Sequence, residues 1–448
     1  MSECLLSVGL DVGTTSTQLV VSRLVVENRA SGFAVPDLEI TQREILYRSP
    51  VHFTPLLSGS LVDGQGLRQL VEAEYTAAGI SRESVDTGAI IITGETSRKE
   101  NARTVLSALS ELAGDFVVAT AGPDLESILA AKGAGAAAYS EKSGETVLHM
   151  DIGGGTSNLA LIRDGKIVQT GCLNVGGRLV KFSEDGAVMY LSPVLSGMTS
   201  MRLGEIPTKE QREDLTEQLA EALEMAAGRR EPTQLLQKLM TEEAVQPWVP
   251  PAEDVVVSFS GGVADCIGEA FPDLIFGDLG PELGKSIRDS RLCRGAYVLG
   301  RETIRATVIG AGCHSTQLSG STVYHQNIRF PLKNLPVMEI PDMADLSGAE
   351  AAEEGGAVLS FAGDAPQSYR ELTQMAEKLL SQVKPPLFLC LRQDMAKALG
   401  QALALRLPPE TEILCIDRVK VGEGSFLDIG APVGGALPVV VKTLVLSK

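Results

Sequence analysis

Three features of the sequence predict an α/β protein with two or three domains. A bend of glycine and small hydroxyl residues, headed by an aspartate, occurs twice, as LDVGTTSTQLVV from Leu10 and MDIGGGTSNLAL from Met150. A buried-strand pattern, VVVSF from Val255, leads through two glycines into a helical run. The chain also has 448 residues, more than one hydrophobic core usually serves.

The composition is that of a well-packed protein that avoids nucleic acids and membranes. Hydrophobic residues make up 44% and charged residues 21%, and the formal net charge is -18. Such a surface repels phosphodiester backbones and acidic lipids, so neither nucleic acid nor a membrane is an expected partner. The seven cysteines are widely spaced, without a C-x-x-C pair. This pattern indicates reduced thiols in the cytoplasm and argues against a zinc site or an iron–sulfur cluster.

The two glycine-rich bends align without gaps. Asp11 falls on Asp151 and Gly13 falls on Gly153, and a strand-like apolar run precedes and follows each bend. One such match could arise by chance, but two in the same register are much harder to obtain by chance. We therefore expect the same strand–turn–strand unit at both places.

The residue types of these bends suit the binding of phosphate and magnesium. Glycines at a tight bend leave backbone N–H groups pointing outward, which makes a cradle for an anion. An aspartate there would repel phosphate unless a cation lay between them, and Mg²⁺ commonly binds through one or two carboxylates together with phosphate. We expect Asp11 and Asp151 to act as metal-binding and catalytic acids for ATP; a pair of purely structural hairpins is the alternative. The expected phosphate-binding residues are Gly13, Thr14, Thr15, Ser16, Gly153, Gly154, Gly155, Thr156 and Ser157.

The third glycine-containing segment fits the same ligand. Gly261 and Gly262 follow the apolar run and precede a helical run from Val263 to Ala270. Without side chains there, an adenine or ribose could lie against the backbone at the start of the helix. A strand, two glycines and a helix are also common in ordinary α/β packing, so this segment gains weight only beside the other two.

In their order along the chain, these segments resemble the motifs of the actin, Hsp70 and sugar kinase ATPase superfamily. The resemblance implies an actin-like, ribonuclease H-like fold of two lobes, in which two connecting helices cross closely through small residues such as Gly133. The segments that look like the two phosphate motifs, the adenosine motif and the two connecting motifs are Leu10–Ser22, His149–Ile162, Val257–Asp265, Pro123–Tyr139 and Gly280–Ile287.

Within that superfamily the whole chain resembles the reactivating factors of ethanolamine ammonia-lyase. The resemblance runs through LSVGLDVGTTSTQLV, IIITGETSRKENA, HMDIGGGTSNLALI, FGDLGPELGKSIR and VIGAGCHSTQLSGSTVY. It implies an ATP- and Mg²⁺-dependent, chaperone-like protein that frees an adenosylcobalamin enzyme, ethanolamine ammonia-lyase, of damaged cobalamin. It also implies a place in the cytoplasm, at the ethanolamine-utilisation bacterial microcompartment. A small-molecule kinase and a filament-forming actin-like ATPase remain alternatives, and a homo-oligomer is compatible with the sequence.

Three further residues are candidates for the chemistry. Thr93 ends a strand-like run, and the resemblance implies that a threonine here helps to bind the metal; helix capping explains it equally well. The resemblance also implies a water-orienting acid near the first connecting motif. Asp124 and Glu126 both qualify, and the sequence does not decide between them.

The domain limits follow from the motif positions. We expect a first ATPase lobe over 1–143 with a β-rich insertion at about 24–62, and a second lobe over 144–300 with a helical insertion at about 190–250. Residues 301–448 read as a C-terminal α/β domain that engages the partner enzyme.

Two segments of this C-terminal domain are rejected as nucleotide sites. The GAGCHS after Ala306–Ile309 is only a partial dinucleotide fingerprint, and Asp428-Ile429-Gly430 is followed by Pro432 without a Thr/Ser pair.

Overall fold

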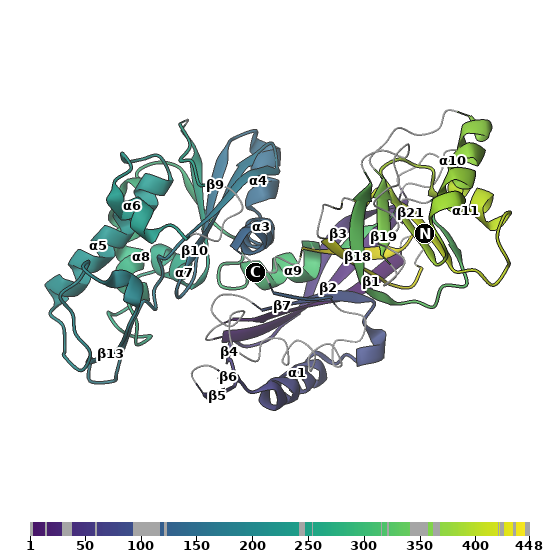
Figure 1. The fold of residues 1–448 in the computed structure, drawn as a ribbon. Coiled ribbons are helices and arrows are strands. Elements are labelled where there is room, and N and C mark those ends of the chain that lie inside the picture. Colours follow the sequence, from purple (N-terminus) through teal and green to yellow (C-terminus); the bar gives the residue numbers. More distant parts are fainter. Residues whose placement is uncertain are drawn as a thin grey trace. The chain divides into compact units, whose positions relative to one another are not determined.

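The computed structural model falls into two compact units that the chain enters more than once (Figure 1). The first unit comprises Met1–Ile92, Lys99–Thr120 and Ser315–Lys448, and the second comprises Thr93–Arg98 and Ala121–His314. The predicted domains follow chain order whereas these units follow contacts, so the predicted limits stay a prediction. The structure describes residues 3–13, 16–28, 38–58, 61–92, 117–120, 123–241, 247–252, 254–314, 316–319, 322–340, 357–361, 368–419, 421, 425–432 and 436–443.

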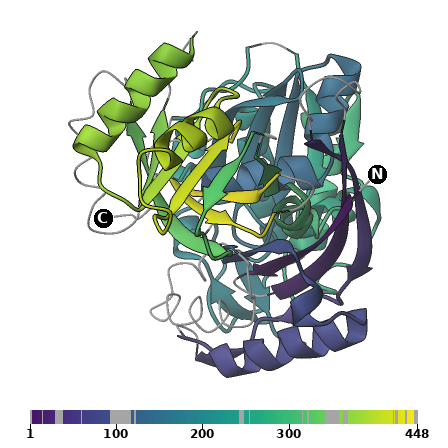
Figure 2. The same ribbon diagram turned by 90° about the vertical axis from the view of Figure 1, so that its right-hand side faces the viewer.

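The first unit begins with a sheet in which an antiparallel meander is extended by two parallel strands. Helix α1 (Gly64–Ala78) packs on this sheet through Leu67 and Val71, and the Asp63 side chain caps its first turn (Figure 2). The sequence pattern of 63–78 also predicts a helix, and this prediction is confirmed. Across the sheet the strands are β3 (Leu38–Arg48), β2 (Ser16–Asn28), β1 (Glu3–Val12), β7 (Thr87–Ile92) and β8 (Val117–Thr120), with the short β4 (His52–Phe53) beside β2 and the pair β5 (Leu56–Ser58) and β6 (Leu61–Val62) apart.

The central sheet of the second unit has the same strand order and directions as that first sheet. Its meander is β11 (Lys166–Leu173), β10 (Ser157–Arg163) and β9 (Val147–Ile152), followed by the parallel strands β14 (Val256–Ser260) and β15 (Tyr297–Leu299). The register repeats too, because Asp11 lies opposite Gln18 on β2 and Asp151 lies opposite Asn158 on β10. The internal repeat predicted from the sequence is confirmed at the level of strand pairing.

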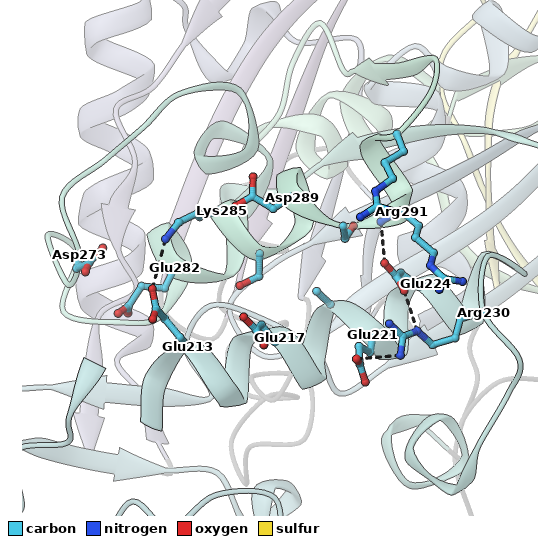
Figure 3. Close-up of a pocket in the computed structure, with 14 residues that line it drawn as sticks. Glu213, Glu217, Glu221, Glu224, Arg230, Asp273, Glu282, Lys285, Asp289 and Arg291 are labelled. Atoms are coloured by element: carbon cyan, nitrogen blue, oxygen red, sulfur yellow. Dashed lines mark hydrogen bonds and ion pairs between the residues drawn. The ribbon is translucent and has the colours of Figure 1, made fainter. Parts of the chain in front are cut away.

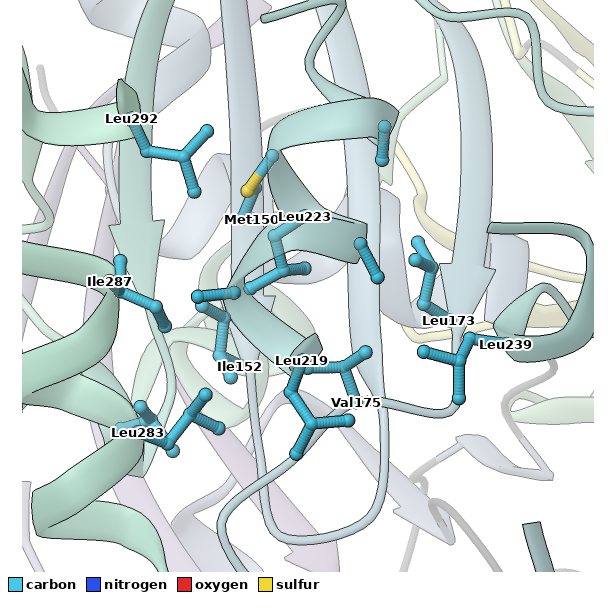
Figure 4. Packing of buried hydrophobic residues seen from close by; sticks show 14 of the residues in the cluster. Met150, Ile152, Leu173, Val175, Leu219, Leu223, Leu239, Leu283, Ile287 and Leu292 are labelled. Carbon is cyan, nitrogen blue, oxygen red and sulfur yellow. The ribbon is translucent and has the colours of Figure 1, made fainter. Parts of the chain in front are cut away.

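Helices and one small β-ribbon surround the second sheet. Leu219 and Leu223 of α5 and Leu283 and Ile287 of α8 pack with Met150 and other side chains of the sheet in one large core (Figure 4). The capping box of α5, formed by Thr208 and Gln211, fixes where that helix begins. The helices and the ribbon are α3 (Pro123–Gly133), α4 (Ala136–Ser143), α5 (Lys209–Ala226), α6 (Gln234–Leu239), α7 (Gly262–Gly268), α8 (Gly280–Asp289), α9 (Ala306–His314), β12 (Val180–Phe182) and β13 (Val188–Leu191).

Two helices of the second unit, α3 and α9, touch backbone to backbone. A Cβ atom on Gly133 would lie 1.8 Å from the carbonyl oxygen of Ala306, and one on Gly310 would lie 2.1 Å from that of Leu129. The close crossing expected of α3 is therefore present, but its predicted partner, Gly280–Ile287, is wrong. That segment forms α8, which packs on α5 and α7. The run at 306–309 belongs to the true partner, α9, and is helical.

The rest of the first unit is an eight-stranded mixed sheet with a parallel centre. Helices α10 (Tyr369–Gln382) and α11 (Ala396–Ala404) pack together against its parallel strands. No helix in the described part of the chain is long and apolar enough to cross a membrane. In order the strands are β16 (Thr316–Leu318), β23 (Pro438–Thr443), β22 (Ser425–Ile429), β18 (Leu332–Ile340), β19 (Val358–Phe361), β20 (Leu387–Leu391), β21 (Ile413–Asp417) and β17 (Tyr324–Gln326).

The variant Gly133→Ala tests the contact between α3 and α9. Its added methyl group would meet backbone atoms that cannot turn aside, so we expect the free energy of unfolding to fall by about 3 kcal/mol despite alanine's better helix propensity. Urea denaturation measures the change. Gly295→Ala is the control, because a methyl group there meets open space, and it should alter the free energy by about 0.5 kcal/mol or less. Equal losses in the two variants would contradict the contact.

Candidate functional site

The second glycine-rich bend joins β9 to β10 at the edge of the second unit's sheet. The N–H of Gly153 donates to the carbonyl oxygen of Thr156 at 2.9 Å, which closes the turn. Gly155 is exposed, and a Cβ atom on it would meet nothing within 4 Å. Gly176 passes so close that a Cβ atom on it would lie 2.4 Å from the carbonyl oxygen of Gly154. One side of the turn is thus packed against backbone, and the other is open to a ligand.

Asp151 precedes this turn and is almost completely buried, with 9% of its surface exposed. Ser260 donates a hydrogen bond to its carboxylate, and the hydroxyl of Thr307 on α9 donates another. Burial nevertheless raises the pKa of Asp151 from its ordinary value to about 6, because the two hydrogen bonds offset only part of the lost hydration. A carboxylate that is so well shielded from water is stabilised by a nearby cation or by protonation.

A buried hydrogen-bonded chain continues from Asp151 into the sheet. His149 lies 2.9 Å from the Ser260 hydroxyl through Nε2 and 3.1 Å from the Ser258 hydroxyl through Nδ1. Burial lowers the pKa of His149 to about 3, so the ring is neutral and carries one N–H. Ser260 gives its proton to Asp151 and must accept from Nε2, which leaves Nδ1 to accept from Ser258. The chain of donors therefore ends on Asp151.

The two acids that the sequence left undecided have different surroundings. Glu126 on α3 is buried and accepts a 2.9 Å hydrogen bond from Asn158, the residue opposite Asp151. Asp124 instead accepts a hydrogen bond from Thr170 on β11. The structure therefore brings Glu126, and not Asp124, to the neighbourhood of Asp151.

Gly261 and Gly262 follow directly on the residue that pairs with Asp151. Parallel pairing sets Ser260 opposite Asp151, so the two glycines leave the sheet at the same edge as the 153–156 turn. Gly261 has a φ of 87° and lies against the backbone of Ile152, where a Cβ atom would come within 2.3 Å. Only glycine fits there. Ser157 has another role than expected, since its hydroxyl is buried and donates to the carbonyl oxygen of Val175.

The first glycine-rich bend, in the first unit, is built in the same way. The N–H of Gly13 donates to the carbonyl oxygen of Ser16 at 2.8 Å, as Gly153 does to Thr156. The carbonyl oxygen of Gly13 also accepts a 2.8 Å hydrogen bond from the hydroxyl of Thr54. Asp11 is half-buried at the end of β1. The expected ligands Thr14, Thr15 and Thr93 lie outside the described residues.

These donors fit magnesium bound through few protein ligands. Among the described residues no three His, Cys, Asp or Glu side chains gather as a metal site. Each bend offers one carboxylate, Asp11 or Asp151, which matches the habit of Mg²⁺ to keep waters and to bind phosphate oxygens. The buried, proton-attracting carboxylate of Asp151 would be relieved by such a cation.

Several residues of the site were not predicted from the sequence. Ser258, Ser260 and His149 interrupt otherwise apolar strands at alternate positions, which places them on one face of the sheet. That period-two polar pattern was the available signal. Thr307 and Asn158 gave no such signal, because nothing in the sequence indicates that α9 and α3 meet at this edge.

A groove of about 340 Å³ lies between α5 and α8 and includes none of the predicted site residues (Figure 3). Arg230 pairs with Glu221 and Glu224, and Lys285 pairs with Glu213. Carboxylates outnumber cations along its lining, so the groove disfavours ligands that carry phosphate.

Comparison with known proteins bears on the identity of the chain. The family model described as Ethanolamine utilisation protein EutA matches residues 3–447. The ethanolamine ammonia-lyase reactivase EutA of Salmonella typhimurium (strain LT2) is 40% identical over 478 residues, with 98% of each chain covered. The protein of the same name from Escherichia coli (strain K12) is 40% identical over 465 residues, also with 98% of each covered. The solved structure of ethanolamine utilization protein EutJ from Carboxydothermus hydrogenoformans is 18% identical with a TM-score of 0.34, covering 68% of this chain and 88% of that one.

The burial of Asp151 predicts a pH-dependent gain in stability from Asp151→Asn. Because the pKa of Asp151 is higher in the folded chain than in the unfolded chain, the free energy of unfolding falls as the pH rises from about 4 to above about 6. Removing the charge should stabilise the chain by about 3 kcal/mol at about pH 8 and by almost nothing at about pH 4. Urea unfolding at both pH values measures this. The control Asp214→Asn, on the exposed side of α5, should change the free energy of unfolding by the same amount at both pH values. A pH-independent effect of Asp151→Asn would refute the prediction.

Proposed function

The chain belongs to the EutA family of ethanolamine utilisation proteins, and from this premise we propose that it is an ATP-dependent reactivating factor of ethanolamine ammonia-lyase. In this role it drives the release of damaged cobalamin from the lyase, so that intact adenosylcobalamin can bind again. Two relatives that carry the reactivase name match at 40% identity over 98% of the chain, which supports the assignment of the activity.

The observation that carries the dependence on ATP is the duplicated turn with its acid. Both turns close through the same hydrogen bond, and both place an aspartate opposite an amide side chain on the neighbouring strand. A structural hairpin needs no carboxylate before its turn, and least of all a buried carboxylate whose pKa is raised, as that of Asp151 is. A glycine-rich turn headed by one acid suits the phosphate groups and the Mg²⁺ of a nucleoside triphosphate.

Each residue then has a definite task. Backbone N–H groups of the 153–156 turn bind phosphate, and the open backbone at Gly261 and Gly262 receives the adenosine end. Glu126, fixed by Asn158, orients the attacking water. Asp11 and Asp151 are the residues that would hold Mg²⁺, and the ion would neutralise the charge that develops on the transferred phosphoryl group.

Hydrolysis can supply enough free energy difference to switch the affinity for the lyase. Moving a two-state equilibrium from about 1:99 to 99:1 needs about 5.5 kcal/mol of differential binding. Hydrogen bonds to a charged group contribute about 1.5–3 kcal/mol each. Loss of a few terminal-phosphate contacts to the two turns is therefore sufficient. We place this cycle in the cytoplasm, at the bacterial microcompartment for ethanolamine use, with the lyase as the partner.

Reactivation of the lyase tests the proposal directly. Ethanolamine ammonia-lyase inactivated with cyanocobalamin is mixed with this chain, ATP, Mg²⁺ and adenosylcobalamin, and ammonia release is followed. Asp11→Asn and Asp151→Asn should each lower the reactivation rate by more than about 100-fold, since each removes charge at a phosphate cradle.

Asp428→Asn is the matched control for these two variants. Asp428 heads the same Asp-Ile-Gly tripeptide as Asp151, and it is buried, but Pro432 follows it instead of a hydroxyl pair. This variant should reactivate the lyase at the wild-type rate. Full reactivation by both cradle variants would refute the proposal. Formation of phosphoethanolamine without the lyase would favour a kinase, and ATP-dependent sedimentation would favour a filament.

Glu126 and Asp124 are separated by single-turnover ATP hydrolysis. Glu126→Gln should still bind ATP but hydrolyse it about 100-fold more slowly, because its carboxylate faces Asn158 beside Asp151. Asp124→Asn should stay within about threefold of the wild-type rate, because Asp124 is engaged by Thr170. The reverse order of effects would assign the water-orienting role to Asp124.

A further inference from the structure

An arginine that no sequence motif singled out lies against the second glycine-rich turn. The backbone N–H of Arg178 donates to the carbonyl oxygen of Gly154 at 2.6 Å. The stem of its side chain covers the same glycine, since a Cβ atom on Gly154 would lie 3.4 Å from both Cβ and Cδ of Arg178. The absence of a side chain at Gly154 therefore gives this arginine its place on the turn.

A buried carboxylate fixes the direction of the Arg178 side chain. Nε of Arg178 donates to Asp278 at 2.9 Å, and only 8% of the Asp278 side chain is exposed. The other oxygen of Asp278 accepts the N–H of Gly280 at 2.8 Å, at the start of α8. Asp278 is thus held from two sides. The Arg178 side chain that it anchors remains 33% exposed.

The charges around the turn explain why a cation is useful there. Asp151, Glu126 and Asp278 are all buried acids of the same unit, and the chain as a whole carries a net charge of -18. A polyphosphate that approaches the turn meets this negative field before it reaches any backbone N–H. A guanidinium offers five N–H groups in a planar fork that matches phosphate oxygens, and the one on Nε donates to Asp278.

We propose that Arg178, positioned by Asp278, binds the phosphate groups of the nucleotide at the 153–156 turn. This inference rests on the proposed function, because it names a further ligand of the same nucleotide. Arg178 makes direct contact with the phosphates. Asp278 is a positioning residue that fixes the direction of the Arg178 side chain through Nε.

A second arginine of the same unit provides a closely matched control. Nε of Arg230 donates to the buried Glu224 at 2.9 Å, and its side chain is 35% exposed. The donor atom and the distance are the same as for Arg178, the exposure is similar, and the acceptor is again a buried carboxylate, although Arg230 also pairs with Glu221. Arg230, however, lines the groove between α5 and α8, and that groove includes no residue of the 153–156 turn. If breaking such an ion pair were enough to weaken ATP binding, Arg178→Gln and Arg230→Gln should therefore weaken it alike.

The experiment measures equilibrium binding of ATP and of adenosine, with Mg²⁺, to the full-length wild type and to Arg178→Gln, Arg178→Lys and Arg230→Gln. Arg178→Gln should weaken ATP binding by about tenfold or more and leave adenosine binding unchanged, since only ATP offers a partner for the guanidinium. Arg178→Lys should recover part of the affinity, because it keeps the charge but not the fork. Arg230→Gln should bind both ligands as the wild type does.

Asp278→Asn tests the positioning role through a double-mutant cycle. Alone it should lower the ATP-to-adenosine affinity ratio, and combined with Arg178→Gln it should add little further loss, because both changes remove one interaction. Unchanged ATP affinity in Arg178→Gln, or an equal loss in Arg230→Gln, overturns the inference while the nucleotide function stands. A wild-type chain that binds no ATP overturns both.

Discussion

The burial of the Asp151 carboxylate is the constraint around which the second unit is organised. A charge taken out of water must be met by donors, by a counter-ion or by a proton. The chain supplies donors from two directions, Ser260 on the adjacent strand and Thr307 on a helix far along the sequence. These donors replace only part of the lost hydration, and the pKa of Asp151 is therefore raised. The buried carboxylate lowers the stability of the fold, and such a loss of stability is typical of functional sites.

The parts of the site that could be predicted from the sequence are those formed by contiguous residues. The two turns are local objects, so glycines, hydroxyls and the acid that heads them can be recognised before any fold is known. The α/β class was also correct, because short apolar runs and helical runs differ in period. The helix predicted at 63–78 is a local feature of the same kind.

The parts that could not be read depend on which distant segments meet. ATVIGAGC at 306–313 has several β-branched and glycine residues and looks like a strand before a turn, yet it is helical. Its Gly310 makes a backbone contact with α3, and no rule of propensity identifies the partner of such a contact. The same holds for Glu126, whose neighbour Asn158 is fixed by tertiary packing, and for Arg178, whose anchor lies a hundred positions away.

The contact between α3 and α9 has a mechanical consequence. Thr307 ties α9 to Asp151, Gly133 and Gly310 join α9 to α3, Glu126 ties α3 to Asn158, and Asn158 faces Asp151 across the strand pair. These links form a closed ring. The helix crossing within it has no layer of side chains that could deform and absorb a shift. A small displacement of any member must therefore be passed round the ring almost undiminished, as in a stiff linkage.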